Sequence, residues 1–283
     1  MRVSTNQIYN LGLGSMQKHA QEVMDYQTQI SSGSKYRHAS DSGLAAGLSV
    51  QVQLNQAQFD MFKVNQDFLN TTYSISETQI KAIKDELVRA QQLMVQAGND
   101  AIGDSARKAI ATELQSIQTS VAQAINAKDA NGDSVFKEQL HPIQVAPTLM
   151  LDSGVLQTDM TTITPATGSD FTLDDLFSGV IAQLQGTGAG RAAGPTKDQY
   201  TQISDALAQI TQSQVKIGAL TNRLDAATQM AETQKTNVET ERSHLLDTDL
   251  AEASAGLMKS NALLSAAQSV MAKMDINTLF QKL

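Results

Sequence analysis

Histidines and acidic side chains are the residues of this sequence that could bind a metal or transfer a proton. The four histidines lie far apart, at positions 19, 38, 141 and 244. A zinc site needs several ligands at short, fixed spacings. None of the four histidines has a histidine or carboxylate partner in such a pattern. The sequence therefore predicts isolated histidines in loops or in solvent, and it predicts no metal site.

Other motifs begin like ligand-binding loops but do not complete the pattern. The stretch 129–133 (DANGD) opens like a calcium loop, which then needs Gly at its sixth position and Glu at its twelfth. This chain has Ser134 and Leu140 there, so an ordinary turn is expected. The glycines of 186–194 lack the Gly-Lys-Ser/Thr ending of a phosphate loop. Lys35 to His38 form a basic cluster, interpreted as a solvated loop or a contact to an acidic neighbour. We predict no catalytic, cofactor-binding or metal-binding residues.

The composition excludes several classes of protein. The net charge of −8 argues against a general nucleic-acid binder, which would carry a basic face. No run of 18 apolar residues exists, so no membrane insertion is predicted. The absence of cysteine rules out disulfides and thiolate metal sites. The first ten residues are polar and lack the apolar core of a secretory signal peptide, which leaves other export routes open.

A long apolar stripe dominates the first half of the chain. From Leu48 to Ala97, steps of four and three residues meet apolar side chains at twelve of fifteen positions, against 41% apolar residues in the whole chain. This is the seam spacing of packed helices, and it predicts one helix roughly 80 Å long at about 1.5 Å per residue. A third seam from Ile110 to Ala124 is expected to fold back antiparallel, and a fourth runs from Ile203 to Val238.

The middle of the chain has a different character. Residues 129–195 hold all four prolines and eight of the seventeen glycines. Apolar runs at 143–145 and 148–151 suit strands, and a helix is expected near 174–184 behind a capping pattern at 172–175. A second capping pattern, Thr196 with Gln199, predicts the start of the next helix. The inserted segment is thus expected to be a small mixed α and β domain.

The two ends of the chain carry apolar seams that can pair with each other. The first seam runs from Tyr9 to Ile30 and ends at a loop over 31–43. The last follows a break at 243–248, where Asp247 is expected to cap the helix. Because a two-helix hairpin covers only one side of each seam, we expect exposed apolar surface there, which marks an interaction site. The predicted assembly interface comprises Leu13, Met16, Val23, Ile30, Leu250, Leu257, Leu264, Met271, Leu279 and Phe280.

The predicted fold is mainly α: a long antiparallel helical bundle with paired terminal helices and the inserted domain. Two stretches resemble a known family. Residues 29–41 (QISSGSKYRHASD) with 43–50 (GLAAGLSV) resemble the N-terminal signature of bacterial flagellins and their relatives. Residues 217–225 (IGALTNRLD) with 241–252 (ERSHLLDTDLAE) resemble the C-terminal one. The opening MRVST and the ending NTLFQKL resemble the hook–filament junction branch of that superfamily.

The resemblance implies a domain plan and a role. Residues 1–42 and 244–283 would form an inner terminal domain, 43–128 and 196–243 a helical rod, and 129–195 an outer domain. The chain would be a structural subunit that links hook to filament in the bacterial flagellum by axial self-assembly. It would leave the cell through the flagellar type III export apparatus without a cleavable signal.

The same resemblance implies partners, and rival functions stay open. The partners would be a ring of identical subunits, flagellin, the other hook-associated junction protein and, before secretion, an export chaperone. A short filament flagellin is the alternative within the family, and an intracellular coiled-coil scaffold is the alternative from another class. An enzyme housed in residues 129–195 is a third, but those 67 residues hold no convincing nucleophile–base pair.

Overall fold

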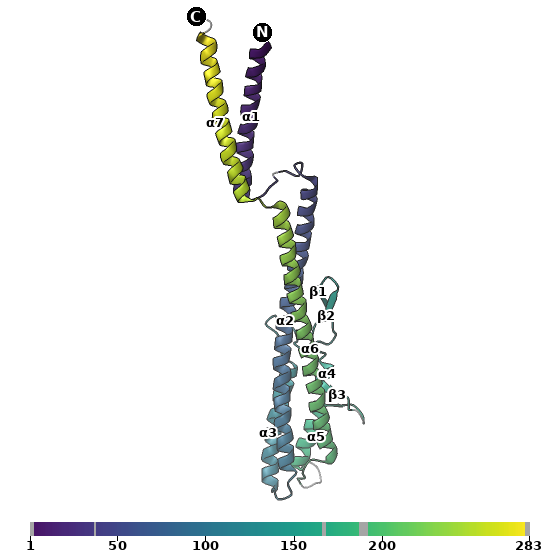
Figure 1. Ribbon diagram of the computed structural model, residues 1–283. Coiled ribbons are helices and arrows are strands. Elements are labelled where there is room, and N and C mark those ends of the chain that lie inside the picture. Colours follow the sequence, from purple (N-terminus) through teal and green to yellow (C-terminus); the bar gives the residue numbers. More distant parts are fainter. Residues whose placement is uncertain (1–2, 37, 166–167, 187–191, 281–283) are drawn as a thin grey trace. The chain divides into compact units, whose positions relative to one another are not determined.

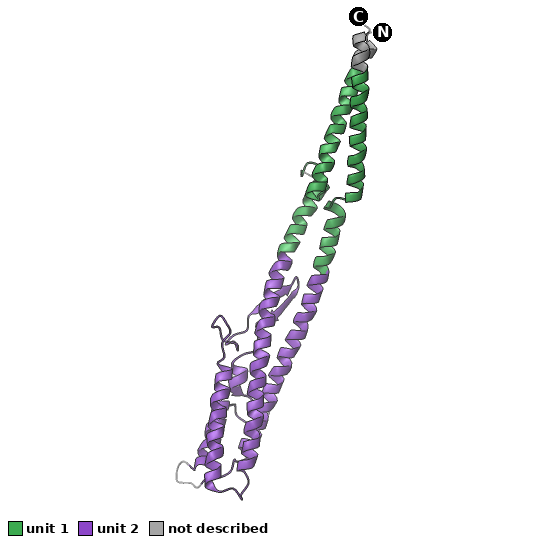
Figure 2. Cartoon of the chain, turned by 90° about the vertical axis from the view of Figure 1, so that its left-hand side faces the viewer, with its two compact units in different colours: residues 1–57, 234–283 green, residues 58–233 purple. Residues whose placement is uncertain are grey.

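A computed structural model describes residues 3–36, 38–165, 168–186 and 192–280, with side chains described from residue 7 to 273 except residue 8. The chain divides into two compact units, which Figure 2 colours separately. Unit 1 comprises residues 1–57 and 234–283, and unit 2 comprises residues 58–233. Two long helices, α2 (Gly43–Ala97) and α6 (Lys197–Leu246), contribute residues to both units.

Unit 1 contains the paired terminal helices that the sequence predicts. Helix α1 spans Val3–Ser32 and helix α7 spans Leu250–Phe280. The two lie side by side in both ribbon views (Figure 1, Figure 2). Because the pair has only two helices, each can cover only one side of the other. The apolar side chains on the remaining sides stay accessible.

The break before α7 lies close to its predicted position, but the predicted cap is wrong. Helix α6 ends at Leu246 and α7 begins at Leu250. The side chain of Asp249, not Asp247, accepts hydrogen bonds from the backbone N–H groups of Ala251 at 2.9 Å and Glu252 at 3.1 Å. Asp247 instead pairs with the loop after α1 and forms an ion pair with Arg242 at 3.3 Å. At the N-cap of α7, Asp249 thus pairs with amide groups of the first helical turn that have no partner within the helix.

Unit 2 buries the long seam of α2. Every seam position from Phe62 to Ala97 is buried, and the faces between them are largely exposed. Helix α3 (Asp104–Ile125) buries Ile110, Leu114, Ile117 and Val121 of the predicted third seam. The α6 seam contributes Ile203, Ile210, Ile217 and Leu224. A heptad-like spacing keeps each of these stripes on one side of its helix, so the three helices share one core.

The middle segment packs on these helices. An antiparallel hairpin pairs β1 (Pro142–Ala146) with β2 (Leu149–Asp152), and a second short pair joins β3 (Thr162–Ile163) to β4 (Phe171–Thr172). Helix α4 (Thr158–Thr161) precedes β3, and α5 (Leu173–Gln185) follows β4. Apolar residues of the hairpin, α4 and α5 join α2, α3 and α6 in a single hydrophobic cluster. The predicted strands and helix are confirmed in type and place.

Both predicted N-terminal caps form, and the second is a complete capping box. The Thr172 hydroxyl oxygen accepts a hydrogen bond from the Asp175 N–H at 3.1 Å and opens α5. Ahead of α6, the Gln199 N–H donates to the Thr196 hydroxyl at 3.2 Å, and the Thr196 N–H donates back to the Gln199 side chain at 2.8 Å. Such reciprocal bonds satisfy amides at both ends of the first turn. They fix where α5 and α6 begin.

A buried arginine closes the end of unit 2 where α2 turns into α3. The Arg107 side chain is largely buried, and its guanidinium donates to the carbonyl oxygens of Ala97, Asn99 and Ala192 at 3.2–3.3 Å. A planar guanidinium with five donors can serve several carbonyls at once. It therefore ties the α2–α3 turn to the segment ahead of α6.

Across the parts of the chain described, no helix is long and apolar enough to span a bilayer.

Candidate functional site

The candidate site is the surface of the α1–α7 pair. The two helices run antiparallel, so that Gly12 lies against Met271 and Tyr26 lies against Gly256. Between these contacts, the Ser260 hydroxyl donates to a carboxylate oxygen of Glu22 at 3.1 Å. Small residues such as Gly and Ser at these positions allow the two backbones to approach. Apolar packing and the Ser260–Glu22 hydrogen bond thus both hold the pair together.

A histidine completes the polar contact. His19 Nδ1 lies 3.0 Å from the same Glu22 oxygen, one helical turn away on α1. This hydrogen bond is the largest of the effects that lower the pKa of the Glu22 carboxyl. The prediction of an isolated histidine in a loop or in solvent is therefore wrong for His19, which lies on α1 beside a carboxylate. The signal was available, because residues three apart on a helix are neighbours. Between residues 3 and 280, outside the gaps, no group of three or more potential metal ligands occurs.

The ten predicted interface residues divide into three sets. Six are partly buried, where each helix faces its partner. Leu13 and Leu250 are exposed, and the side chains of Leu279 and Phe280 lie outside the described residues. The partly buried set is Met16, Val23, Ile30, Leu257, Leu264 and Met271. These side chains thus lie along the pair itself, while their role in contacts between subunits stays a prediction.

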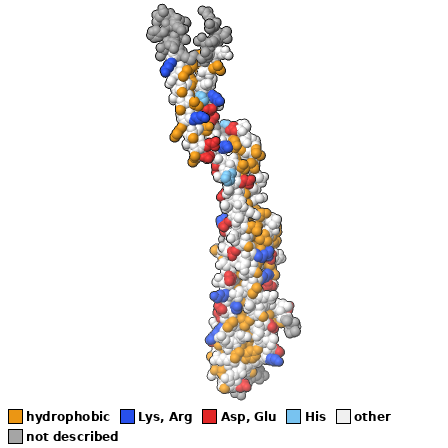
Figure 3. All heavy atoms as spheres, viewed as in Figure 1, with side chains coloured by type: hydrophobic (Ala, Val, Ile, Leu, Met, Phe, Trp, Pro, Cys, Tyr) orange, Lys and Arg blue, Asp and Glu red, His pale blue; other side chains and the backbone are white. Residues whose placement is uncertain are grey.

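Several large apolar side chains off the seam are strongly exposed. Met258 exposes 73% of its surface and Leu11 exposes 67%. Figure 3 shows hydrophobic side chains scattered over the visible face of the terminal pair. Among the described residues, Met24, Leu263 and Val270 are the other exposed large apolar side chains off the seams of α1 and α7, and the seam residues Tyr9, Leu13 and Leu250 are exposed as well. The ten predicted interface residues leave out Leu11, Met24, Met258, Leu263 and Val270, because most of the ten were taken from the seam, much of which lies partly buried in the pair.

The basic cluster lies in the loop between α1 and α2. The loop backbone pairs with the α6–α7 junction: the Lys35 N–H donates to the Leu246 carbonyl at 2.8 Å, and the Thr248 N–H donates to the Gly33 carbonyl at 2.9 Å. Arg37 of the cluster lies outside the described residues. These two bonds connect the loop between α1 and α2 to the junction between α6 and α7. The prediction that this cluster lies in a loop is confirmed for its described residues.

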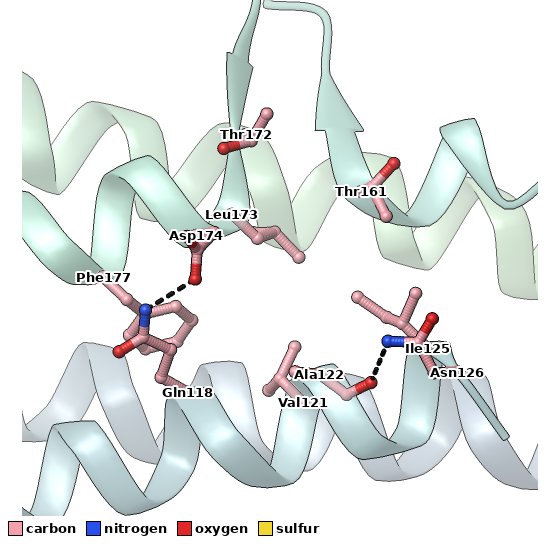
Figure 4. A pocket seen from close by; sticks show the side chains of 10 residues that line it. All are labelled: Gln118, Val121, Ala122, Ile125, Asn126, Thr161, Thr172, Leu173, Asp174 and Phe177. Atoms are coloured by element: carbon pink, nitrogen blue, oxygen red, sulfur yellow. Dashed lines mark hydrogen bonds between the residues drawn. The ribbon is translucent and has the colours of Figure 1, made fainter.

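Unit 2 offers a pocket of about 330 Å³ between α3 and α5 (Figure 4). Its floor is apolar, with Val121 and Phe177 among the lining residues. Of the ten residues that line it, only Asp174 is ionisable, and its carboxylate accepts a hydrogen bond from Gln118 at 2.7 Å. Residues 129–133, which resemble the start of a calcium loop, form a turn. In this turn the Asp129 carboxylate accepts hydrogen bonds from the backbone N–H groups of Asn131 and Asp133, both at 2.9 Å. Neither arrangement pairs a nucleophile with a base.

The features above define a class of helical proteins in which the N-terminal helix α1 and the C-terminal helix α7 form an antiparallel pair with exposed apolar side chains. Two family models match the chain: the bacterial flagellin N-terminal helical region over residues 3–140 and the bacterial flagellin C-terminal helical region over residues 200–283. Together they cover more than three quarters of it. The chain therefore belongs to the bacterial flagellin family, as its two terminal signatures indicate.

Within that family, two curated proteins are similar in different ways. Flagellar hook-associated protein 3 of Salmonella typhimurium is 29% identical over 136 residues, which cover 48% of this chain and 43% of the relative. The alignment thus spans less than half of that relative. Flagellin of Bacillus subtilis is 23% identical over 268 residues, covering 87% of this chain and 86% of the relative.

Solved structures support the fold. A putative flagellar hook-associated protein from Vibrio parahaemolyticus superposes with a TM-score of 0.63 at 18% sequence identity. The superposition covers 73% of this chain and all of the other. At this identity the likeness concerns the fold, and it agrees with the predicted mainly α, flagellin-like architecture.

Proposed function

We propose that this chain is a structural subunit of the bacterial flagellum that links hook to filament. The observation that carries the proposal is the terminal pair, which presents exposed side chains such as Leu11 and Met258 along both helices. Water-exposed apolar area of this kind stabilises an assembly when a neighbour covers it. The similarity to hook-associated protein 3 favours the junction as the place of that assembly.

In this proposal the predicted domains acquire roles. Residues 1–42 and 244–283 pack against their copies around an axis, residues 43–128 and 196–243 form the rod, and residues 129–195 face outward. The ten predicted interface residues lose their remaining water contact when subunits stack. Folding of the ends and assembly are then coupled, so that the ordering cost is met at the moment of binding. No reaction is catalysed.

The proposed partners follow from the same position in the flagellum. One end of a ring of identical subunits meets the other hook-associated junction protein, and the other end meets flagellin. The apolar C-terminal helix is covered by an export chaperone before the chain leaves the cell without a cleaved signal. The mature subunit is then extracellular, as part of the flagellum.

A pair of methionine variants tests the proposal. Met258→Glu places a charge on the exposed surface of α7, and Met150→Glu makes the same change on β2, where the side chain is 59% exposed. Because burying an unpaired charge is costly, we expect Met258→Glu to lower incorporation into detached hooks by about tenfold or more, while Met150→Glu incorporates normally. Deletion of residues 247–283 should abolish incorporation and leave unit 2 folded. Normal incorporation of both Met258→Glu and the truncated chain would contradict the proposal.

A short filament flagellin is the second candidate, favoured by the alignment to Bacillus subtilis flagellin over most of both chains. Mixing the purified protein with filament seeds separates the two candidates. A flagellin extends the seeds without other proteins, whereas a junction subunit binds hook ends and does not elongate. Recovery of the protein only from cells, and not from culture supernatant or detached flagella, would instead favour an intracellular scaffold.

A further inference from the structure

The seams of α1 and α7 do not by themselves specify how the two helices align. Both consist mainly of Ala, Leu, Ile, Val and Met at heptad-like spacing, so a slip of seven residues would again place mostly apolar residues opposite apolar residues. Such a slip would move one helix along the other by about 10 Å, at about 1.5 Å per residue. Something other than the apolar pattern must select one register.

Three contacts along the pair are specific to a single register. A Cβ atom built on Gly256 would lie 2.5–2.9 Å from three ring atoms of Tyr26. A Cβ atom on Gly12 would lie 2.7 Å from the Met271 sulfur. Each glycine therefore receives a large side chain that no other residue type could admit without a shift. Between them, Ser260 donates its hydrogen bond to Glu22.

These contacts belong to one antiparallel alignment, since the residue numbers of each pair add to 282 or 283. In a register slipped by seven residues, Tyr26 would face Leu263 rather than a glycine. Met271 would then face His19 instead of Gly12. A rigid aromatic ring against a leucine separates the backbones, and overpacking of this kind typically destabilises a contact. In the slipped alignment, neither Tyr26 nor Met271 lies opposite a glycine, so the fit of a large side chain against a glycine is lost at both contacts.

We infer that Gly256 with Tyr26, supported by Gly12 with Met271 and by the Glu22–Ser260 bond, sets the register of the terminal pair. The Gly256 contact is the stronger determinant because a tyrosine ring is rigid, whereas the Met271 side chain can rotate away. The inference deepens the proposed function and rests on it for its consequence. Because both helices supply the exposed side chains, a slipped pair would present a different surface to neighbouring subunits.

Cysteine cross-linking in the purified full chain measures the register directly, since the natural sequence contains no cysteine. Ala267→Cys on α7 is combined with one of three cysteines on α1. Met16→Cys continues the observed alignment, while Tyr9→Cys and Val23→Cys report slips of seven residues in either direction. A thiol cross-linker shorter than the roughly 10 Å slip is used, and the intramolecular product is quantified. We expect the pair with Met16→Cys to react about tenfold faster than the other two, a preference of about 1.4 kcal/mol.

Glycine variants then test the cause of the preference. Gly256→Ala should remove most of the tenfold preference, and Gly12→Ala should reduce it less. Gly14→Ala is the matched control, because a Cβ there meets nothing within 4 Å although the gain in helix propensity is the same. Adding Tyr26→Ala to Gly256→Ala removes the clash and should restore the preference in part, which a general unfolding of the helices would not allow.

Two results would overturn the inference: equal rates for the three cysteine pairs in the parent chain, or a Gly256→Ala variant that keeps the preference seen with Gly14→Ala. Incorporation into detached hooks is measured separately on the same glycine variants without cysteines. A variant that loses its register and still incorporates normally would count against the proposed function while the register inference stands.

Discussion

At the residue scale, the most informative polar contact is that of Tyr73 in the core of unit 2. Its side chain is fully buried, and its hydroxyl donates a hydrogen bond to the Asp152 carbonyl at the end of β2. Burial, and secondarily the nearby Asp152 carboxylate, raises the pKa of Tyr73 to about 12. The folded state therefore holds this proton more tightly than the unfolded chain, whose tyrosines titrate near pH 10.

This shift predicts a loss of stability in alkali. A raised pKa in the folded state contributes stability that is fully present below about pH 10 and disappears as the pH rises toward 12. We expect unit 2 to lose roughly 2–3 kcal/mol from this group over that range. The Tyr73→Phe variant should be about 1 kcal/mol less stable at pH 7 and should lack this part of the pH dependence. Urea unfolding followed by circular dichroism at several pH values measures the difference, with the exposed Tyr9→Phe as control.

Residues are also where prediction from sequence was least complete. The apolar seam positions were predictable because period and side-chain type together define a buried face. The contact between His19 and Glu22 is not a metal-ligand pattern; it follows from the three-residue spacing of neighbours on one helix, which the sequence prediction left out. The roles of Gly12 and Gly256 could not be predicted, because the space beside a glycine depends on which residue the opposite helix brings to it.

At the scale of elements, side chains of the long helix α2 hold the β1–β2 hairpin by hydrogen bonds to its backbone. Its seam contains polar residues, among them Gln66, which the apolar pattern does not explain. The pairing of β1 with β2 shifts register between Gln144 and Ala146, so that Val145 bulges out of the ladder. The buried Val145 carbonyl instead accepts a hydrogen bond from the Gln66 side chain at 2.7 Å, and Asn65 donates to the Gln144 carbonyl at 2.8 Å. The polar seam position thus satisfies a bulged strand.

Replacement of Gln66 by methionine should therefore loosen the hairpin more than the helix. Methionine keeps the volume and the helix propensity of glutamine but leaves the Val145 carbonyl without its donor, which costs about 1–3 kcal/mol. Hydrogen exchange in residues 142–152 should accelerate about tenfold or more, while exchange in α2 changes little. Gln58→Met, at an exposed position eight residues earlier, is the control. Equal acceleration in the helix and the hairpin would show that Gln66 supports the whole unit instead.

The elements themselves were largely predictable from the sequence. Capping patterns at Thr172 and Thr196 placed the starts of α5 and α6, since the side chain and the amide that it satisfies are local. The packing of the middle segment into one hydrophobic cluster with α2, α3 and α6 was not predicted, because apolar runs of four residues do not say which helix they will meet. The cap of α7 was misplaced by two residues in a stretch with aspartate at both 247 and 249.

At the scale of the whole molecule, the two units differ in how much of their apolar surface is covered. Unit 2 has a core in which α2 alone buries Leu69, Ile80 and Leu87 completely. On α1 and α7, the described large apolar side chains are partly buried or exposed. Local opening is easiest where few apolar contacts resist it. The isolated chain should therefore open at its terminal pair long before the core of unit 2 unfolds.

Hydrogen exchange of the isolated and assembled protein tests this difference. In isolation, amides of α1 and α7 should exchange at least about a hundredfold faster than those of α2 between residues 69 and 94, a difference of roughly 3 kcal/mol in opening free energy. In hooks carrying the incorporated subunit, the terminal amides should become protected while the α2 amides change little, because assembly adds contacts only to the former. If the isolated chain protects both ends as well as α2 and shows no tendency to associate, the terminal pair is already complete without neighbours. Coupled folding and assembly would then have to be abandoned.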